Sequence, residues 1–376
     1  MKSAHDFIPI AAPDLDEGEE RYVVDAIRSS WISSSGHYVR TFEARFAEAC
    51  NVKLAASIVN GTAALHLAVE ALGLKPGDEV IVPALTYVAT ANAVRYAQGV
   101  PVFVDVDPAT WCIDPGRIEA AMSPKTKGII AVDIYGHPAD MDRIMQIASR
   151  HRLWVIEDAA EAHFARYRGR VTGGLADVGV FSFYGNKIVT CGEGGAITTN
   201  DADIDRRVRL LRNQGMDPER RYFFPVIGYN YRLTNIACAL LCAQLEKRER
   251  LINRRREIYR RYWQRLEGIA GVGLQPAAPW AEVTPWLFCV TIDEERFGRT
   301  RDELIGVLQE SGIETRPFFI PIHLLPPYAA GPPSDRFPEA ERLGATGLNL
   351  PTFTGMSDAQ IEHVCATLAS ARRHRG

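Results

Sequence analysis

The stretch from residue 153 to 201 most constrains the fold of this chain. It holds three short apolar runs, 153–156, 178–183 and 196–198, which are rich in Val, Ile and Phe and have the length of β-strands. Asp158 follows the first run and Lys187 follows the second. Ligands of open α/β sheets bind outside the carboxyl ends of the strands, so we expect these two side chains to face one pocket.

A carboxylate and a lysine at one pocket suit pyridoxal phosphate, which takes a lysine for its Schiff base and an acid against its ring nitrogen. Asp158, kept ionised, would hold that nitrogen protonated. Lys187 would form the Schiff base and, once released, move protons, provided that burial or a cationic neighbour lowers its pKa. On spacing alone the commoner interpretation is plainer, with Asp158 as a turn or cap residue and Lys187 as a solvated charge.

A second feature suits the phosphate of such a cofactor. A predicted strand at 55–59 is followed by a predicted helix at 62–72, and Gly61 and Thr62 stand where that helix begins. A helix N-terminus presents free N–H groups and the positive end of the helix dipole, which favour a phosphate. Strand–Gly–Thr–helix junctions are common in α/β proteins, so this signal gains weight only beside Asp158 and Lys187.

Composition excludes several classes of function. The chain has 376 residues, long enough for two or three domains, and a net charge of −3, which gives no footprint for nucleic acid. No apolar run reaches 18 residues, and the first 20 residues lack the apolar core of a signal peptide, so we expect a cytoplasmic protein without membrane contact. The seven cysteines form no CxxC pair, which indicates reduced thiols and no metal site.

The order of predicted elements indicates the architecture. Strands and helices alternate through 55–156, which argues for a mainly parallel, doubly wound sheet. We expect a large domain over 1–250, beginning with an extended arm and a helix at 17–28 capped by Asp16, and a smaller α+β domain over 251–376. Apolar positions at helical spacing predict one long helix over 233–266, with room for a bend along it.

Several separated motifs give the chain a resemblance to a known family. They are IYGHPADMD at 134–142, EDAAEAH at 157–163, FSFYGNK at 181–187, GEGGAITTND at 192–201 and RNQGMDPERRYFFPVIGYNYRLTN at 212–235. From residue 8 to about 353 the chain resembles the DegT/DnrJ/EryC1/StrS sugar aminotransferases, which are fold-type I pyridoxal phosphate enzymes. The resemblance implies a large domain with a mainly parallel seven-stranded sheet flanked by helices, and a homodimer or a higher homo-oligomer.

The resemblance also implies roles for residues at matching positions. Lys187 is the catalytic residue and Asp158 meets the pyridine nitrogen, while Tyr87 stacks on the ring. Gly61, Thr62 and Ser182 hold the cofactor phosphate. Asn230, on the long loop within 212–235, reaches the phosphate of the partner subunit. The matches expected on the substrate side are Trp31, Ser33, Arg316 and His323.

Two positions depart from the usual pattern of the family. Glu161 stands where Gln usually bonds the cofactor's 3-hydroxyl, and a carboxyl group needs a shared proton for that role. Phe164 stands where the family normally has Gly, which puts the local backbone conformation in doubt. His163, between them, is either a structural partner or a side chain near Asp158 that tunes it.

The implied reaction moves the amino group of L-glutamate to the C4 ketone of GDP-4-keto-6-deoxy-D-mannose, for a polysaccharide or an antibiotic. The same chemistry on a UDP- or dTDP-linked keto sugar, or on a cyclitol ketone, is the alternative. A pyridoxamine-dependent sugar dehydratase would have His in place of Lys187, and a non-enzymatic relative would lack Asp158 or Lys187. A nicotinamide dehydrogenase is set aside because no GxGxxG follows the first strand.

Overall fold

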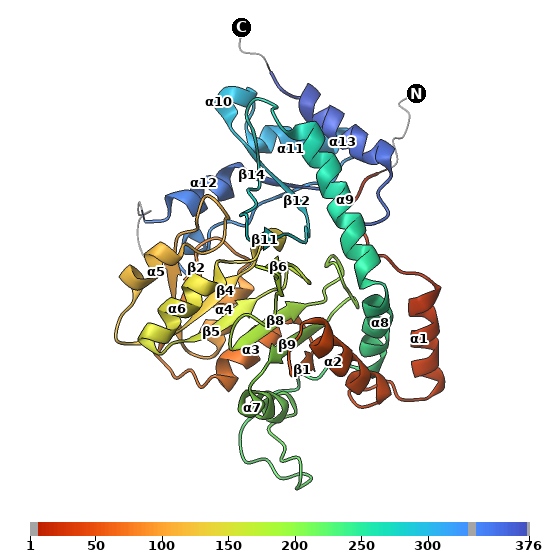
Figure 1. Ribbon diagram of the computed structural model, residues 1–376, viewed down its shortest axis with the longest axis vertical. Coiled ribbons are helices and arrows are strands. Elements are labelled where there is room, and N and C mark those ends of the chain that lie inside the picture. The colour runs from red at the N-terminus through yellow and green to blue at the C-terminus, as the bar shows by residue number, and fades with distance from the viewer. Residues whose placement is uncertain (1–6, 330–335, 374–376) are drawn as a thin grey trace.

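A seven-stranded sheet forms the centre of the computed structural model, which describes residues 7–329 and 336–373 (Figure 1). Its strands lie in the order β1-β9-β8-β5-β4-β2-β3. They are β1 (Leu54–Ile58), β2 (Glu79–Pro83), β3 (Val100–Val104), β4 (Thr126–Val132), β5 (Trp154–Asp158), β8 (Val178–Ser182) and β9 (Gly195–Thr199). Only β9 runs against its neighbours, so the mainly parallel sheet is confirmed.

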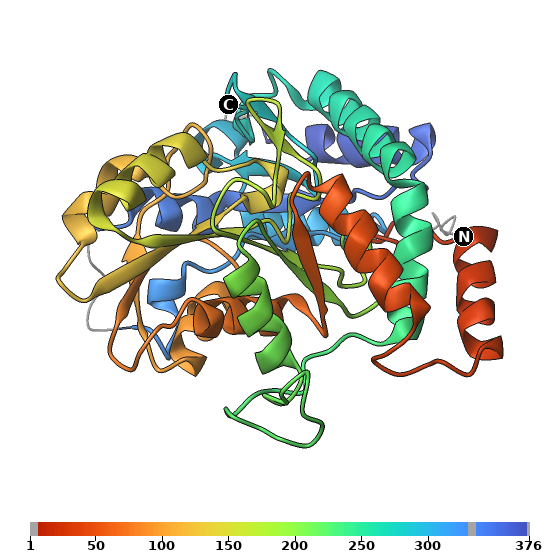
Figure 2. The same cartoon turned by 60° about the horizontal axis from the view of Figure 1, so that its bottom comes forward.

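Helices cover both faces of this sheet, as Figure 2 shows. One face packs on α3 (Gly61–Ala71), α4 (Ala89–Tyr96) and α7 (Ala202–Arg212). The other packs on α2 (His37–Ala49), α5 (Pro115–Ala121), α6 (Met141–His151) and α8 (Asn235–Glu246). Strands that are buried on both faces have continuous apolar sequences, which is why the apolar runs within 153–201 predicted strands.

The first helix is confirmed with its cap. In α1 (Glu17–Arg28) the Asp16 side chain accepts a hydrogen bond from the Gly18 N–H, and the Glu19 side chain accepts one from the Asp16 N–H. This reciprocal arrangement satisfies donors that a bare helix start leaves open. The helix packs on α8 at the edge of the molecule (Figure 1).

The long helix predicted over 233–266 has its bend at Lys247, where it divides into two helices. The chain forms α8 and then α9 (Arg248–Leu266), and Lys247 between them has φ −104° and ψ 11°. The Lys247 ammonium lies within 3.1 Å of carboxylate oxygens of Asp14, Asp16 and Glu19, and these ion pairs fix the break against the N-terminal segment. Apolar periodicity indicates which face of a helix is buried, but it does not give the position of a bend of this kind.

The smaller sheet is antiparallel, and its strands follow α9 in the chain. Its order is β10-β12-β14-β13, with β10 (Val272–Leu274), β12 (Phe288–Ile292), β13 (Arg316–Pro317) and β14 (Gly347–Leu350). It packs in one core with α9, α11 (Arg301–Glu310) and α13 (Asp358–Ser370), near the short helices α10 (Glu294–Phe297) and α12 (Pro338–Thr346). Ile8 belongs to this core and pairs with Ile313, so the described part of the predicted arm joins the C-terminal region. The division at residue 250 stays a prediction, and residues 1–6 of the arm lie outside the described residues.

A three-stranded sheet of β6 (Arg166–Tyr167), β7 (Arg170–Val171) and β11 (Ala281–Glu282) joins the region of the large sheet to the C-terminal region.

Two observations bear on the expected class of protein. All seven cysteines are free thiols. Within residues 7–329 and 336–373, no helix combines the length and apolar character that a bilayer crossing needs.

Candidate active site

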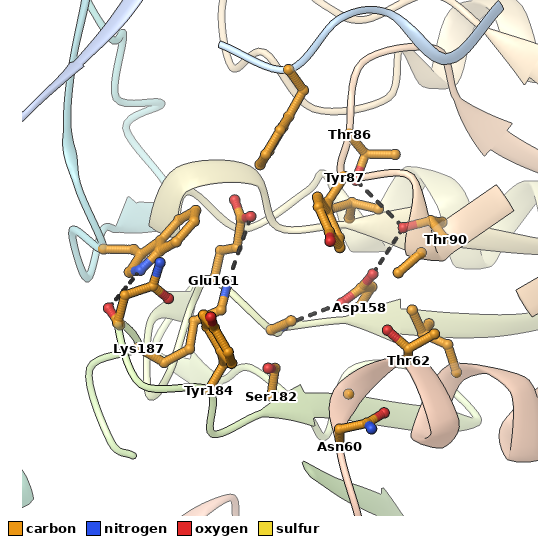
Figure 3. Close-up of a pocket in the computed structure, with 18 of the residues that line it drawn as sticks. Asn60, Thr62, Thr86, Tyr87, Thr90, Asp158, Glu161, Ser182, Tyr184 and Lys187 are labelled. Atoms are coloured by element: carbon orange, nitrogen blue, oxygen red, sulfur yellow. Dashed lines mark hydrogen bonds and ion pairs between the residues drawn. The ribbon is translucent and has the colours of Figure 1, made fainter. Parts of the chain in front are cut away.

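A cavity of about 460 Å³ opens at the carboxyl ends of β5 and β8 (Figure 3). Asp158, Ser182 and Lys187 face it from the strand ends, and the start of α3 faces it from the side. Trp286, Arg316 and Phe319 close it from the C-terminal region. The volume lies in the range typical of small-molecule sites.

Lys187 reaches into this cavity from the turn after β8. Its side chain is 10 % exposed, and its Nζ lies 3.8 Å from Glu161 Oε1 and 3.7 Å from the centroid of the Trp286 ring. Burial lowers the pKa of Lys187, because the ammonium loses its water, while Glu161 and Asp158 oppose that shift. A lysine with a lowered pKa is the kind that serves as nucleophile and base.

Asp158 ends β5 with its carboxylate directed into the same cavity (Figure 3). One oxygen accepts from the Ala160 N–H at 3.2 Å and the other from the Thr90 hydroxyl at 3.1 Å. Burial raises the pKa of Asp158, and those two donors together with Lys187 only partly offset it. A buried carboxylate in this state is stabilised by a further cationic donor, which a protonated pyridine nitrogen supplies.

Glu161 lies between Lys187 and the backbone of the neighbouring loop. Its Oε2 accepts from the Tyr135 N–H at 2.9 Å, and its Oε1 faces Lys187. Burial raises the pKa of Glu161, with Lys187 and the Tyr135 amide opposing. The bond to the backbone leaves one oxygen for the cavity, and the predicted role at the cofactor's 3-hydroxyl remains a prediction.

The start of α3 and the end of β8 form a tight cradle. The Asn60 side chain caps the helix by accepting from the Ala63 N–H at 2.8 Å, which leaves the N–H groups of Gly61 and Thr62 for another partner. A Cβ added at Gly61 would lie 2.7 Å from Ser182 Cβ, so only glycine allows this approach. Backbone N–H groups and two hydroxyls gathered at a helix N-terminus fit a phosphate.

These residues fit pyridoxal phosphate as a set. An acid for the ring nitrogen, a buried lysine and a phosphate cradle line one cavity. Asp158, Lys187, Gly61, Thr62 and Ser182 would hold the cofactor. Tyr87, 56 % exposed at the mouth of the cavity, is available to its ring face.

His163 has a structural role, and the idea that it tunes Asp158 directly is not supported by its contacts. Its Nδ1 accepts from the Val189 N–H at 3.2 Å, so the proton sits on Nε2, which donates to the Ser182 carbonyl at 2.9 Å. Burial, followed by the charge of Lys187, lowers the pKa of His163 to about 3, which keeps the ring neutral. His163 therefore ties the turn that carries Lys187 to the end of β8.

Phe164 resolves the question raised by the missing glycine. Its φ is 57°, in the left-handed region that glycine favours, so the backbone conformation is retained by a residue that bears a side chain. The buried ring packs edge-on against Phe46, with centroids 6.0 Å apart. Packing of the ring offsets a strain of about 1–2 kcal/mol.

Not every predicted site residue reaches this cavity. Arg316 lines it, but His323 lies elsewhere, with its Nε2 at 3.0 Å from Glu341. Trp31 borders a separate cavity of about 260 Å³. Ser33 uses its carbonyl to accept from the Asn235 N–H. Asn230 is exposed and pairs with Asn213, so its predicted reach into a partner subunit stays a prediction.

Two residues that the sequence did not single out contact the key groups. Thr90 bonds Asp158 and lies 3.4 Å from the Thr86 hydroxyl. Thr90 lies in the first turn of α4, in the segment that follows β2, and the segments that follow parallel strands commonly carry site residues, which could have indicated it. Trp286 contacts Lys187 across 99 residues of chain, and no local pattern signals such a contact.

Comparison with known proteins places these features in context. The model of the DegT/DnrJ/EryC1/StrS aminotransferase family matches residues 13–369. A GDP-perosamine synthase of Caulobacter vibrioides is 48% identical over 96% of this chain and 97% of its own. A GDP-perosamine synthase of Escherichia coli O157:H7 is 42% identical over 96% and 98%. The crystal structure of DesI, determined in the presence of its TDP-sugar product, superimposes with a TM-score of 0.91 at 34% identity, covering 97% of this chain and 93% of DesI.

Proposed function

The chain belongs to the DegT/DnrJ/EryC1/StrS aminotransferase family, and from that premise we propose that it is a GDP-perosamine synthase. It would move the amino group of L-glutamate to the C4 ketone of GDP-4-keto-6-deoxy-D-mannose. Pyridoxal 5′-phosphate is the cofactor.

The observation that carries the chemistry is the meeting of Lys187 and Asp158 in one cavity. They come from positions 29 residues apart, and parallel pairing of β5 with β8 brings them together. The phosphate cradle at Gly61 and Thr62 lines the same cavity. The GDP-linked substrate is supported by relatives at 48% and 42% identity over almost the whole chain.

The residues of the site have separable tasks. The cofactor, when bound, carries the amino group between the two substrates and draws electrons from the carbon that loses its proton. Asp158 holds a proton on the ring nitrogen, and Thr90 fixes the carboxylate that does so. Lys187 Nζ would take the proton from the α-carbon of the amino donor and, in the second half of the reaction, would give a proton to C4 of the sugar, a role worth about 10²–10⁴-fold in rate.

The substrate assignment is tested with purified protein, L-glutamate and a panel of keto sugar nucleotides. We expect 2-oxoglutarate and an amino sugar nucleotide from GDP-4-keto-6-deoxy-D-mannose, with UDP- and dTDP-linked 4-keto sugars at least about 10-fold poorer in kcat/KM. A preference for a UDP- or dTDP-linked sugar would move the proposal to that nucleotide. Absence of 2-oxoglutarate with every ketone, a cyclitol ketone included, would end it.

We also propose a homodimer in which Asn230 completes the partner's phosphate site. Support comes from the loop before Asn230, where Tyr222 is 72 % and Ile227 is 91 % exposed. Large apolar side chains exposed together on one loop are typical of a surface that a protein partner covers. The protein is proposed to work in the cytoplasm, in keeping with its seven free thiols.

Subunit mixing tests the role of Asn230. Lys187→Ala and Asn230→Ala subunits, each nearly inactive alone, should regain roughly a quarter of wild-type activity after co-refolding, because half of the random dimers carry one intact site. If Asn230 serves its own subunit, mixing restores nothing. A monomer with full activity would remove Asn230 from the site.

A further inference from the structure

The amine of Lys187 has an aromatic neighbour that the chemistry above leaves without a task. Its Nζ lies 3.7 Å from the centroid of the Trp286 ring, closer than its 3.8 Å contact with Glu161 Oε1. A cation within about 6 Å of an indole face is attracted by the ring quadrupole, most strongly where water is excluded. Little of either group reaches solvent: the Lys187 side chain is 10 % exposed, and Trp286 as a whole residue is 6 % exposed.

Trp286 is itself held firmly in this orientation. Its indole N–H donates to the Asn186 carbonyl at 2.9 Å, which ties the ring to the residue just before Lys187. Its own carbonyl accepts from the Arg255 guanidinium at 2.7 Å, and Arg255 also donates to the Thr352 carbonyl at 3.1 Å. Tyr135 lies nearly parallel to the indole, with centroids 6.3 Å and ring planes 17° apart. The ring, its N–H and its backbone are therefore each held by a separate contact.

We propose that Trp286 is a positioning residue for Lys187, whose free ammonium it holds against its indole face beside Glu161. The inference deepens the proposed function and rests on it, because Lys187 must be parked within reach whenever its nitrogen carries no bond to the cofactor. A lysine side chain loses about 2 kcal/mol of rotamer freedom when it is fixed. An indole face offers a cation a fixed site without a hydrogen bond that would have to break before the amine acts.

The charged and titratable groups that face Lys187 act in different directions. Glu161 and Asp158 favour the ammonium, and burial disfavours it. His163 stays neutral behind the turn, and Glu193 and Arg316 line the same cavity further out. The indole adds attraction for the ammonium without adding a charge, so weakening its quadrupole should lower the pKa of Lys187.

Site-specific fluorination of Trp286 isolates this effect, since fluorine drains the ring's negative face with little change in size or burial. The readout is the pKa of Lys187 in the cofactor-free protein, taken from the pH dependence of its acetylation rate by peptide mass spectrometry. From tryptophan to tetrafluorotryptophan we expect a stepwise fall of about one pH unit, a roughly 10-fold larger fraction of free amine at a fixed pH. Trp286→Phe, with a weaker ring face, should lie between the ends of the series.

Trp280 provides the matched control, because it packs against Tyr167 and His137 and makes no contact with Lys187 in the structure. The same fluorinated residues at position 280 should leave the Lys187 pKa unchanged. A flat series at position 286, or a rise, would overturn the inference even if the enzyme turns over. A stepwise fall in a protein that aminates no ketone would uphold it and refute the proposed function instead.

Discussion

The active-site cavity has two walls of different origin. The strand-end wall consists of Asp158, Ser182 and Lys187 with the start of α3. The small-domain wall, named after the domain predicted over 251–376, consists of Trp286, Arg316 and Phe319. Neighbouring strands of one sheet set the first wall, because each residue leaves the sheet at a register fixed by backbone pairing. The second wall reaches the cavity because Trp286 and Phe319, distant in the chain, pack into the core beside the large sheet.

This difference in origin corresponds to a difference in task. In the proposed function, the strand-end wall holds the groups that bind the cofactor and move protons, and little of it reaches solvent. The small-domain wall offers an aromatic face, an exposed guanidinium and a second ring, which suit positioning and substrate selection. Changes in the strand-end wall should therefore stop the chemistry for every substrate, whereas changes in the small-domain wall should alter affinity or preference.

The sharpest test of the strand-end wall is Lys187→Ala. We expect kcat to fall by at least about 10⁴-fold, because nucleophile and base are lost together. Borohydride should no longer fix the cofactor to the peptide containing residue 187, while pyridoxamine phosphate still binds. The exposed Lys75 gives a matched control, since Lys75→Ala should behave as wild type. An active Lys187→Ala enzyme would transfer the role to another group.

Asp158→Asn should have the next largest effect. The amide keeps the shape of the side chain and removes the charge that stabilises a protonated ring nitrogen, so we expect a loss of about 10²–10³-fold in kcat. Thr90→Val, which removes only the hydroxyl that fixes Asp158, should cost about 3- to 10-fold. Steady-state kinetics with a saturated cofactor would measure both. Equal effects of the two changes would contradict the charge argument.

The two walls also differ in how far the sequence predicted them. Asp158, Lys187 and Gly61 sit at the ends of short apolar runs or at a helix start, so spacing and turn chemistry indicated them and a family resemblance strengthened them. Trp286 came to light only in the structure, because its contact depends on the packing of two cores. For the same reason periodicity predicted α8 and α9 as one helix that could bend, and did not locate the break, which the ion pairs of Lys247 fix.

Arg316→Ala probes the small-domain wall. Arg316 is exposed on β13, and its guanidinium lies 3.5 Å from Glu314, a pairing that leaves donors for a ligand. We expect KM for one substrate to rise about 10- to 100-fold with kcat within about 3-fold, as for loss of a hydrogen bond to a charged group. Arg117→Ala, at an exposed site on α5, is the control. A fall in kcat with unchanged KM would place Arg316 with the chemistry and weaken the division between the walls.

The smallest effect on activity is expected from a pair of carboxyl groups beneath the strand-end wall. Asp133 and Glu157 are fully buried, and Asp133 Oδ2 and Glu157 Oε1 have no hydrogen-bond partner outside this pair among the described residues. Burial raises the pKa of Glu157 to about 7 and the pKa of Asp133 well above its ordinary value, so the pair retains a proton in the folded state. The Asp133 N–H donates to the Asp158 carbonyl at 3.0 Å, which connects the pair to the catalytic strand.

Glu157→Gln replaces that proton with an amide N–H that does not titrate. In the wild type the unfolded chain releases its proton near pH 4.5 and the folded chain near pH 7, so the folded state binds more protons in this window and its stability falls as the pH rises through it. The free energy of unfolding of Glu157→Gln, relative to wild type, should therefore increase by about 2–3 kcal/mol from pH 5 to pH 8. Urea melts at both pH values measure it, with kcat expected within about 2-fold of wild type. Asp133→Asn should also flatten the dependence of wild-type stability on pH, because burial raises the pKa of Asp133 as well. Parallel wild-type and Glu157→Gln stability curves would show that the strand-end wall rests on two ionised carboxylates instead.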